Sequence, residues 1–581
     1  MLVGFGVLGG ALTILAITTR LPLSWLMVCL AILSGVGLAM RRQWPGGRST
    51  WIALALVSPL LADAVDHRPA MWDDFWNWLP SAAYAYWHDS LPWPDLAPSL
   101  SIFPGYPQAM PLMIASASFV GGRFLETAGP VINVLLLAGS SALFAEALAA
   151  ALVRRGRLQA TEMPLALAAC AVAITTLLNP GLDGGVLLSS YADCGTMVAV
   201  GALGLLGIEI LARLAAPGAA NVAGLAWRFG FVGAMLVNLK QANPALLALV
   251  ALGLILVVLR DPAIRTRHAL VQLPRMLGPA IVLFVLWRRY VTQSLPNSEQ
   301  SFRPLDAWNF DVLGQTFAAI GDYLADAPLL HAMMWSVTAV GAVVFFQLPG
   351  KASEARWLAV VCATVWLGYN VFLLIVYLGV MTVSDALIAA DYWRYTPHVA
   401  LLGLYAPVMA LAIVRWPAWP NPRRAIATLA MVVLALCALP ARGDLNNPPG
   451  RAWQRFLRNA AVDMRHMMPR GSKVLIVPAG NSRPFEVAVE YHLWQLDGPE
   501  RQILTTILWN TEDFAKVASW AARGESDYLL IQDAEGTMNG ATDALGLPRL
   551  NRELVLFGWR DGAWKRVKSW PVPPALLQRN S

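Results

Sequence analysis

The sequence predicts a polytopic α-helical membrane protein that ends in a small α/β domain. Hydrophobic residues make up 57% of the 581 residues and charged residues only 14%, whereas a soluble globular chain carries about 25% charged residues. Long apolar runs recur from the N-terminus to about residue 440 and are absent beyond it. This composition excludes a soluble enzyme, a disordered chain and a nucleic-acid-binding protein.

About thirteen apolar runs are long enough to cross, or nearly cross, a bilayer. They lie at 2–18, 22–40, 51–64, 129–153, 163–178, 191–212, 226–239, 243–259, 276–293, 328–348, 357–378, 395–414 and 425–440. The segment 107–122 is also apolar, but it is short and contains two prolines. We therefore expect it to re-enter the membrane or to lie at its surface, surrounded by protein or by a water-filled cavity.

Basic clusters predict the orientation of these helices. They follow apolar runs at 41–48, 154–157, 260–268, 351–356 and 415–424, and the positive-inside rule assigns them to the cytoplasm. About thirteen spans with a cytoplasmic N-terminus satisfy all five and place the C-terminus outside. The prediction is a multi-pass protein of a bacterial inner membrane, with its C-terminal domain in the periplasm. The net charge of +7 then reflects orientation and does not call for a nucleic-acid partner.

Two domains are expected, a membrane domain at 1–440 and a periplasmic α/β domain at 441–581. In the second, strands are predicted at 473–479 and 527–533, helices at 485–494 and 512–524, and a hairpin over 553–570. The domain has no phosphate-binding glycine motif and no Cys/His cluster. A lid or docking role without chemistry is the expectation. The five cysteines lie in apolar stretches without a CxxC pair, so no disulfide framework or zinc site is predicted.

A pair of acidic residues stands out in the outer loop 63–128. Asp73 and Asp74 lie within 67–95, a segment dense in Trp and Tyr, and such density is typical of the membrane–water interface. We expect short amphipathic helices along the membrane surface, broken near Pro80. A carboxylate held there is partly desolvated and suits a general base. The alternative is that one Asp only caps a helix that begins near Phe75.

Isolated polar residues follow at the predicted outer helix ends, and ionisable groups at membrane depth are functional candidates by default. Lys240 and Arg394 are cations on the face where positive charge is disfavoured, and both would suit a lipid-linked phosphate. The alternative for each is snorkelling to the headgroups, and His398 alone suits a packed helix histidine. The other candidate binding residues are Tyr106, Gln108, Asp193, Gln241 and Tyr395.

The order of these motifs resembles glycosyltransferases of the GT-C superfamily, above all the protein O-mannosyltransferase and aminoarabinose-transferase group. The motifs are WDDFWNWL (72–79), FPGYPQAMPL (103–112), YADCGTMVAV (191–200), LKQANPALLAL (239–249) and DYWRYTPHVALL (391–402). The sequence departs from the group in three ways. The His-Pro-Pro turn is absent, Asp74 stands where Glu is commoner, and two extra spans precede the loop.

The resemblance implies an inverting hexosyl- or pentosyltransferase that uses a polyprenyl-phosphate sugar at the periplasmic face. Asp73 or Asp74 would be the general base, and Lys240 and Arg394 would bind the donor phosphate. The acceptor would be a lipid, glycan or protein of the cell envelope. Some relatives use a divalent cation, so Mg²⁺ or Mn²⁺ at Asp73 and Asp193 is compatible with the resemblance, although one Asp pair does not predict a metal site.

Two other functions remain open. A transporter or flippase of a lipid-linked or anionic solute would use the same cations, but the acids cluster on one face, whereas carriers place their sites near the midplane. The second is a catalytically inactive membrane scaffold in which the C-terminal domain carries the function.

Overall fold

A computed structural model of the chain describes residues 1–581 except 42–46, 159–164, 217–221, 297, 299, 348–352, 416–430, 438–447, 478–482, 498–503, 508–513, 534–541, 544 and 574–581. The chain forms two compact units. The membrane unit comprises Met1–Arg68, Asp89–Pro98 and Phe103–Asn446, and the C-terminal unit comprises Pro69–His88, Ser99–Ile102 and Asn447–Ser581. The segment that carries Asp73 and Asp74 is thus grouped with the C-terminal residues, whereas the sequence analysis placed it in the membrane domain.

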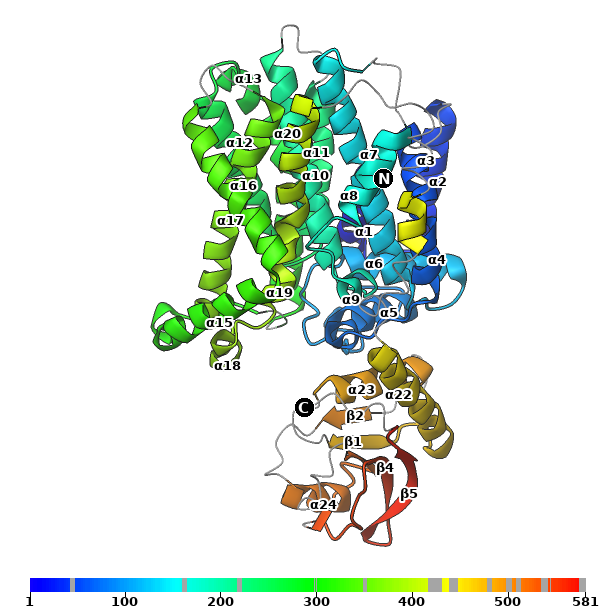
Figure 1. Cartoon of the computed structure of the whole chain (residues 1–581). Coiled ribbons are helices and arrows are strands. Elements are labelled where there is room, and N and C mark those ends of the chain that lie inside the picture. The colour runs from blue at the N-terminus through cyan, green and yellow to red at the C-terminus, as the bar shows by residue number, and fades with distance from the viewer. Residues whose placement is uncertain are drawn as a thin grey trace. The chain divides into compact units, whose positions relative to one another are not determined.

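The membrane unit is a bundle of apolar helices joined by short turns (Figure 1). Its elements are α1 (Leu2–Thr19), α2 (Leu23–Arg41), α3 (Arg48–Leu56), α4 (Ser58–Asp66), α6 (Ala109–Gly121), α7 (Ala128–Arg154), α8 (Leu165–Thr175), α9 (Gly184–Leu187), α10 (Asp193–Ala215), α11 (Val222–Val237), α12 (Asn243–Arg260), α13 (Thr266–Leu270), α14 (Leu273–Ser294), η2 (Leu305–Ala307), η3 (Phe310–Val312), α15 (Leu313–Asp326), α16 (Pro328–Gln347), α17 (Glu354–Gly379), α18 (Val383–Leu387), α19 (Tyr392–Tyr395), η4 (Thr396–Val399) and α20 (Ala400–Arg415).

The predicted fold class is confirmed. Among the described residues, 8 helical stretches are long and apolar enough to cross a membrane. The pair α3 and α4, bent by 55° at its break, meets the same criteria when the two helices are taken together, as a broken span or a re-entrant loop would. Shorter apolar helices include α2, α8 and α11. Each predicted run coincides with one of these elements, except 425–440, which lies mostly outside the described residues. In the segment 107–122, α6 has 13 residues and is about 20 Å long, too short for a hydrocarbon core of about 30 Å.

Small residues bring the central helices close together. A Cβ atom on Gly201 of α10 would lie 3.0 Å from Cβ of Leu401 in α20. A Cβ atom on Gly253 of α12 would lie 2.9 Å from Cα of Val361 in α17. Close backbone approach of this kind is how small residues pack helices in membranes. It fixes α10 against α20, and residues next to these two helices carry the site described below.

The two ends of the bundle differ in charge. At one end, Arg154 at the end of α7 pairs with Glu209 of α10 and with Glu354 of α17, both at 2.9 Å. Asp193 begins α10, and the 16 residues between it and Glu209 correspond to about 24 Å of helix. Figure 1 accordingly shows α13 and α19 at opposite ends of this unit. The basic loops at 154–157 and 260–268 therefore lie at the end away from Asp193, while the side of the membrane that each end faces stays a prediction.

The C-terminal unit contains a five-stranded sheet in the order β2-β1-β3-β4-β5. The strands are β1 (Lys473–Val477), β2 (Leu504–Ile507), β3 (Tyr528–Gln532), β4 (Glu553–Arg560) and β5 (Ala563–Pro571), and the helices are α22 (Pro448–Met467), α23 (Arg483–Asp497) and α24 (Phe514–Ala522). β1 runs parallel to β2 and β3, and β3, β4 and β5 are antiparallel neighbours. The predicted strands, helices and hairpin coincide with β1, α23, α24, β3 and β4–β5. The sequence analysis missed α22 and β2.

The acid-bearing segment differs from its prediction. Asp74–Trp78 forms a π-helical turn, η1, which continues directly into α5 (Leu79–Trp87). Pro80 does not break the helix: it is the second residue of α5, directly after the wide π-helical turn η1. Every residue from Leu79 to Ala85 is buried. The prediction of amphipathic helices broken near Pro80 is therefore wrong, since the segment stays helical through Pro80 and residues 79–85 leave no side exposed.

Candidate functional site

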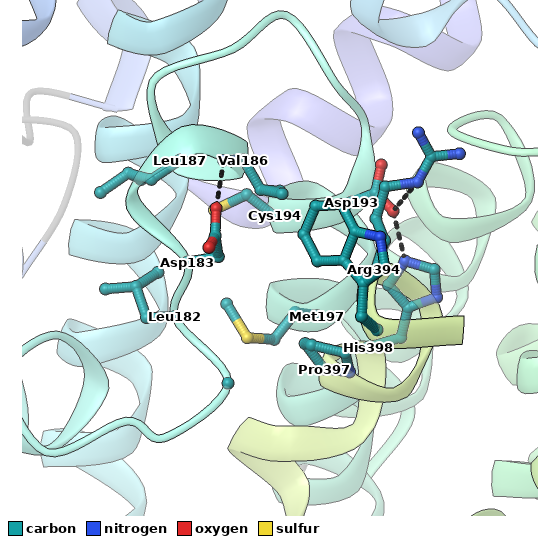
Figure 2. A pocket seen from close by; sticks show the side chains of 12 residues that line it. Leu182, Asp183, Val186, Leu187, Asp193, Cys194, Met197, Arg394, Pro397 and His398 are labelled. Atoms are coloured by element: carbon teal, nitrogen blue, oxygen red, sulfur yellow. Dashed lines mark hydrogen bonds and ion pairs between the residues drawn. The ribbon is translucent and has the colours of Figure 1, made fainter. Parts of the chain in front are cut away.

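Four of the predicted side chains meet in the membrane unit, and we call them the Asp193 cluster: Asp193, Lys240, Arg394 and His398. They come from three segments that are distant in the sequence: the first residue of α10, the turn between α11 and α12, and the consecutive short helices α19 and η4. Figure 2 shows Asp193, Arg394 and His398 side by side. The N-terminal end of α10 provides partial positive charge for the Asp193 carboxylate.

One carboxylate oxygen organises the cluster. Oδ1 of Asp193 lies 2.6 Å from Nζ of Lys240, 2.9 Å from Nε2 of His398 and 3.7 Å from Nε of Arg394. The side chains of Asp193 and Arg394 are 3% and 7% exposed. Charges this far from water are tolerated only when they are paired, so each cation is also a partner that the carboxylate needs.

A second carboxylate balances Arg394. Its guanidinium lies 3.1 Å from Oδ2 of Asp391. Asp391 adopts a left-handed conformation with φ 62°, which Asp tolerates better than most residues and which starts the short helix α19. The group of two cations and two carboxylates is therefore close to neutral. An anionic ligand would have to compete with Asp193 or Asp391 for these cations.

His398 orients the carboxylate. Its Nδ1 lies 2.8 Å from the hydroxyl of Tyr369, and its Nε2 faces Asp193. Because the Asp193 carboxylate can only accept, Nε2 carries the proton, and Nδ1 accepts from the Tyr369 hydroxyl. The histidine is buried, as the alternative interpretation expected, but it also bonds to the central carboxylate.

Tyrosine rings line the cations. Nζ of Lys240 lies 5.1 Å from the ring centre of Tyr395, and the Arg394 guanidinium lies 4.9 Å from Tyr191 and 5.3 Å from Tyr395. Such cation–π contacts stabilise positive charge away from water. The sequence analysis named Tyr395 but missed Tyr191 and Tyr369. Tyr191 carried a signal, since it stands two residues before Asp193 in the motif at 191–200.

A small cavity adjoins the cluster, with a volume of about 20 Å³. Its walls include Met197 and Pro397, the side chains of Arg394 and His398, and the loop and short helix α9 around Asp183 (Figure 2). The Asp183 carboxylate caps α9 by accepting the N–H of Val186 at 2.9 Å. The cavity has room for about one water molecule, so a sugar would need the surrounding segments to move.

Three other predicted residues gather around Gln300, which the sequence analysis did not single out. The Tyr106 hydroxyl donates to Oε1 of Gln300 at 3.3 Å, and Nε2 of Gln241 donates to the Gln300 carbonyl at 2.8 Å. Nε2 of Gln108 donates to the Tyr106 carbonyl at 2.8 Å. The structure thus brings the predicted residues of the membrane unit together in two groups, which adjoin where Gln241 follows Lys240.

The acid pair lies in the C-terminal unit. Asp74 is fully buried, and its Oδ2 accepts the Met71 N–H at 2.9 Å while its own N–H donates to the Met71 carbonyl at 3.2 Å. Asp73 is half-buried. Asp73 occupies the N-cap position of η1, but its side chain makes no capping hydrogen bond. Helix capping therefore does not account for Asp73.

A second cavity, of about 50 Å³, lies within the C-terminal unit next to the acid-bearing turn. Three segments line it: the acid-bearing turn and α5 with Trp76 and Pro80, the segment 99–102 with Leu100 and Ile102, and α23 with Glu490 and Tyr491. The aromatic rings of Phe75, Trp76 and Tyr491 and the carboxylate of Glu490 therefore line this space.

The residues do not favour a divalent cation at Asp193. Its Oδ1 already faces Lys240 and His398, and the nearby positive charges of Lys240 and Arg394 would repel a metal ion. In the part of the chain that the structure describes, no group of three or more His, Cys, Asp or Glu side chains could hold a metal. We therefore derive no step that passes through Mg²⁺ or Mn²⁺.

No protein-family model matches the chain, and no curated protein matches it in sequence. Among solved structures, it is similar to the archaeal oligosaccharyltransferase AglB from Archaeoglobus fulgidus in complex with an inhibitory peptide and a dolichol-phosphate. That match has a TM-score of 0.41 and 12% identity, and it covers 90% of this chain and 74% of the other. An Archaeoglobus fulgidus oligosaccharyltransferase tethered to an acceptor peptide via a disulfide bond gives a TM-score of 0.41 and 11% identity, over 89% of this chain and 73% of the other.

Proposed function

We propose that the chain is a membrane glycosyltransferase that moves a sugar from a polyprenyl-phosphate-linked donor to a cell-envelope acceptor in the periplasm. The observation that carries this proposal is the Asp193 cluster. It gathers two cations from separate segments, the buried Arg394 and the half-buried Lys240, at one end of the bundle, away from the basic loops. Snorkelling would place such cations in the headgroups, whereas Lys240 and Arg394 are held inside by carboxylates and tyrosines.

The donor phosphate would be bound by exchange of partners. In the resting cluster, Asp193 is the anion that neutralises Lys240 at 2.6 Å. A phosphate that enters takes over Lys240 and Arg394, the first as a point charge and the second through its planar fork. Fixed positive charge then stabilises the phosphate as it gains negative charge in the transition state.

The acid pair would supply the base. A carboxylate of Asp73 or Asp74 takes the proton of the acceptor hydroxyl, whose oxygen forms a bond to the anomeric carbon. The bond from that carbon to the phosphate oxygen breaks, and polyprenyl phosphate leaves with the electron pair. Attack opposite the leaving group inverts the anomeric configuration. We assign the base to Asp73, because it is half-buried and can reach an acceptor, whereas Asp74 is fully buried and bonded to Met71.

The test is sugar transfer by the purified protein from a panel of polyprenyl-phosphate sugars. Wild type is compared with Asp73→Asn and Asp74→Asn, and with Asp95→Asn as a matched control. Asp95 is 63% exposed in an ion pair with Arg20, so its loss should leave turnover unchanged. A general base contributes about 10²- to 10⁴-fold, and we expect a loss of that size in Asp73→Asn. Turnover that survives in both acid variants would refute the assignment of the base. Lipid flipping without transfer would favour the transporter.

A further inference from the structure

We propose that the C-terminal domain positions the acid pair, with Tyr491 and His492 of α23 as positioning residues for the turn that carries Asp73 and Asp74. The inference rests on the proposed function of these two acids. It gives residues 441–581 a part in the reaction, although no group of those residues is taken to touch the reacting atoms.

The turn needs outside support because of its geometry. η1 is a π-helical turn over Asp74–Trp78. Such wide turns are rare, occur mostly as single turns and are frequent at functional sites. An unusual backbone conformation persists where the surrounding structure determines it. The contacts of η1 therefore decide where Asp74 and its neighbour Asp73 lie.

One support comes from α23, about 415 residues further along the chain. The Phe75 ring lies 5.3 Å from the Tyr491 ring and 5.6 Å from the His492 ring. These three side chains are 3%, 1% and 1% exposed. The distances are those of favourable tilted aromatic pairs. Because Phe75 directly follows Asp74, a displaced Phe75 ring would displace the acid pair.

The two supporting rings are themselves fixed. Nε2 of His492 lies 2.9 Å from Oε1 of Gln454 in α22, and the Tyr491 and His492 rings lie 5.4 Å apart. The support therefore extends from α22 through α23 to the turn. It does not depend on a single side chain that could rotate away.

A second support comes from residues 99–102. The Ser101 hydroxyl donates to Oδ1 of Asn77 at 2.5 Å, and the Ile102 N–H donates to the Trp76 carbonyl at 3.2 Å. The turn is thus bound by hydrogen bonds from this segment and by aromatic packing from α23. If the packing against α23 is lost, the hydrogen bonds from Ser101 and Ile102 should still hold the turn, but its position should shift. Such a shift should lower the rate of catalysis more than the stability of the fold.

The experiment compares Tyr491→Leu and Tyr491→Phe in the full-length chain. The leucine removes the ring that packs on Phe75, and the phenylalanine keeps it. The matched control is Val517→Ala in α24, which removes volume from the sheet core of the same domain, where Val517 is fully buried. Three quantities are measured: kcat, KM for the donor, and hydrogen exchange of the backbone amides at 74–79.

In Tyr491→Leu we expect kcat to fall by about 10- to 100-fold, because small misplacements of catalytic groups have effects of this size. The donor KM should stay unchanged, and amide protection at 74–79 should fall. Tyr491→Phe should keep both kcat and protection. Val517→Ala should lower the melting temperature but keep kcat.

Two results would overturn the inference. One is unchanged protection at 74–79 in Tyr491→Leu. The other is an equal loss of kcat in Val517→Ala, which would mean that only the stability of the domain matters. Hydrogen exchange reports on the packing even without turnover. A wild-type protein that shows the exchange pattern but transfers no sugar would therefore refute the proposed function separately.

Discussion

The Asp193 cluster and the acid-bearing turn hold their charged groups in different ways. In the cluster, Asp193 is surrounded by Lys240, Arg394 and His398 from separate segments, and charge pairing decides the geometry. In the turn, Asp74 bonds to the backbone of Met71, and the aromatic packing of Phe75 decides the geometry. The first region should therefore respond to changes of charge and the second to changes of shape.

The largest expected effect tests whether the two regions have separate tasks. Asp73→Asn should lower kcat by about 10²- to 10⁴-fold and leave the donor KM within about twofold of wild type. The reason is that a base acts in the transition state, whereas donor binding is assigned to the cluster. Steady-state kinetics with varied donor gives both constants. A raised donor KM with unchanged kcat would assign Asp73 to donor binding.

The next effect tests the charge pairing in the cluster. Lys240→Met should abolish measurable turnover and destabilise the protein by about 3–5 kcal/mol, because Asp193 would stay buried without its closest partner. The double variant Lys240→Met with Asp193→Asn should recover most of the stability but none of the turnover. Thermal unfolding in detergent and turnover are the two measurements. A double variant as unstable as the single one would show that Lys240 contributes packing and not charge.

A smaller effect separates two roles for Asp193. If the carboxylate occupies the anion site at rest, Asp193→Asn should tighten inhibition by free polyprenyl phosphate about tenfold. That corresponds to about 1.4 kcal/mol, just below the smallest coupling energies, about 1.5 kcal/mol, measured for close charge pairs. Asn keeps the size of the side chain, so its packing is retained. Weaker inhibition would instead support the role predicted from the sequence, in which Asp193 binds substrate.

The smallest effect concerns the C-terminal unit away from the turn. Asp463 of α22 accepts hydrogen bonds from Nζ of Lys568 at 2.6 Å and from Nε1 of Trp570 at 2.8 Å, and these bonds lower the pKa of its carboxyl. The resulting stability is present above the unfolded pKa of about 3.9 and is lost as the pH falls through the lower folded value. Because Asp463 is 41% exposed, the effect should be at most about 1 kcal/mol.

Asp463→Asn should therefore lower the melting temperature at pH 7 slightly, reduce its dependence on pH in the acidic range and leave turnover unchanged. Melting curves between pH 3 and 7, which bracket the unfolded pKa of about 3.9, provide the check. A large loss of turnover in Asp463→Asn would mean that α22 affects the acid pair by another route than its contact with α23.

The sequence predicted much of the fold, because apolar length and alternating strand patterns are local properties. It also named Asp193, Lys240, Arg394 and His398 one by one, because each is polar in an apolar context. It could not show that one carboxylate oxygen joins them. Tyr369 escaped notice since a tyrosine in an apolar helix has no distinguishing pattern.

The acid-bearing turn was harder to predict. A single π-helical turn is too short to produce a periodic sequence pattern. The residues that pack on Phe75 lie in α23, far along the chain. Local patterns report on contacts between near neighbours and carry no information about such pairings. This is also why the packing of 69–88 with the C-terminal residues was not expected.

The most direct test of the central claim is the product of a single turnover with a competent polyprenyl-phosphate sugar, with its anomeric configuration determined by NMR. We predict a glycosylated acceptor with inverted configuration and an equal amount of polyprenyl phosphate, both formed about 10²- to 10⁴-fold more slowly by Asp73→Asn. A product with retained configuration, or inverted product formed equally fast by Asp73→Asn, would contradict this prediction.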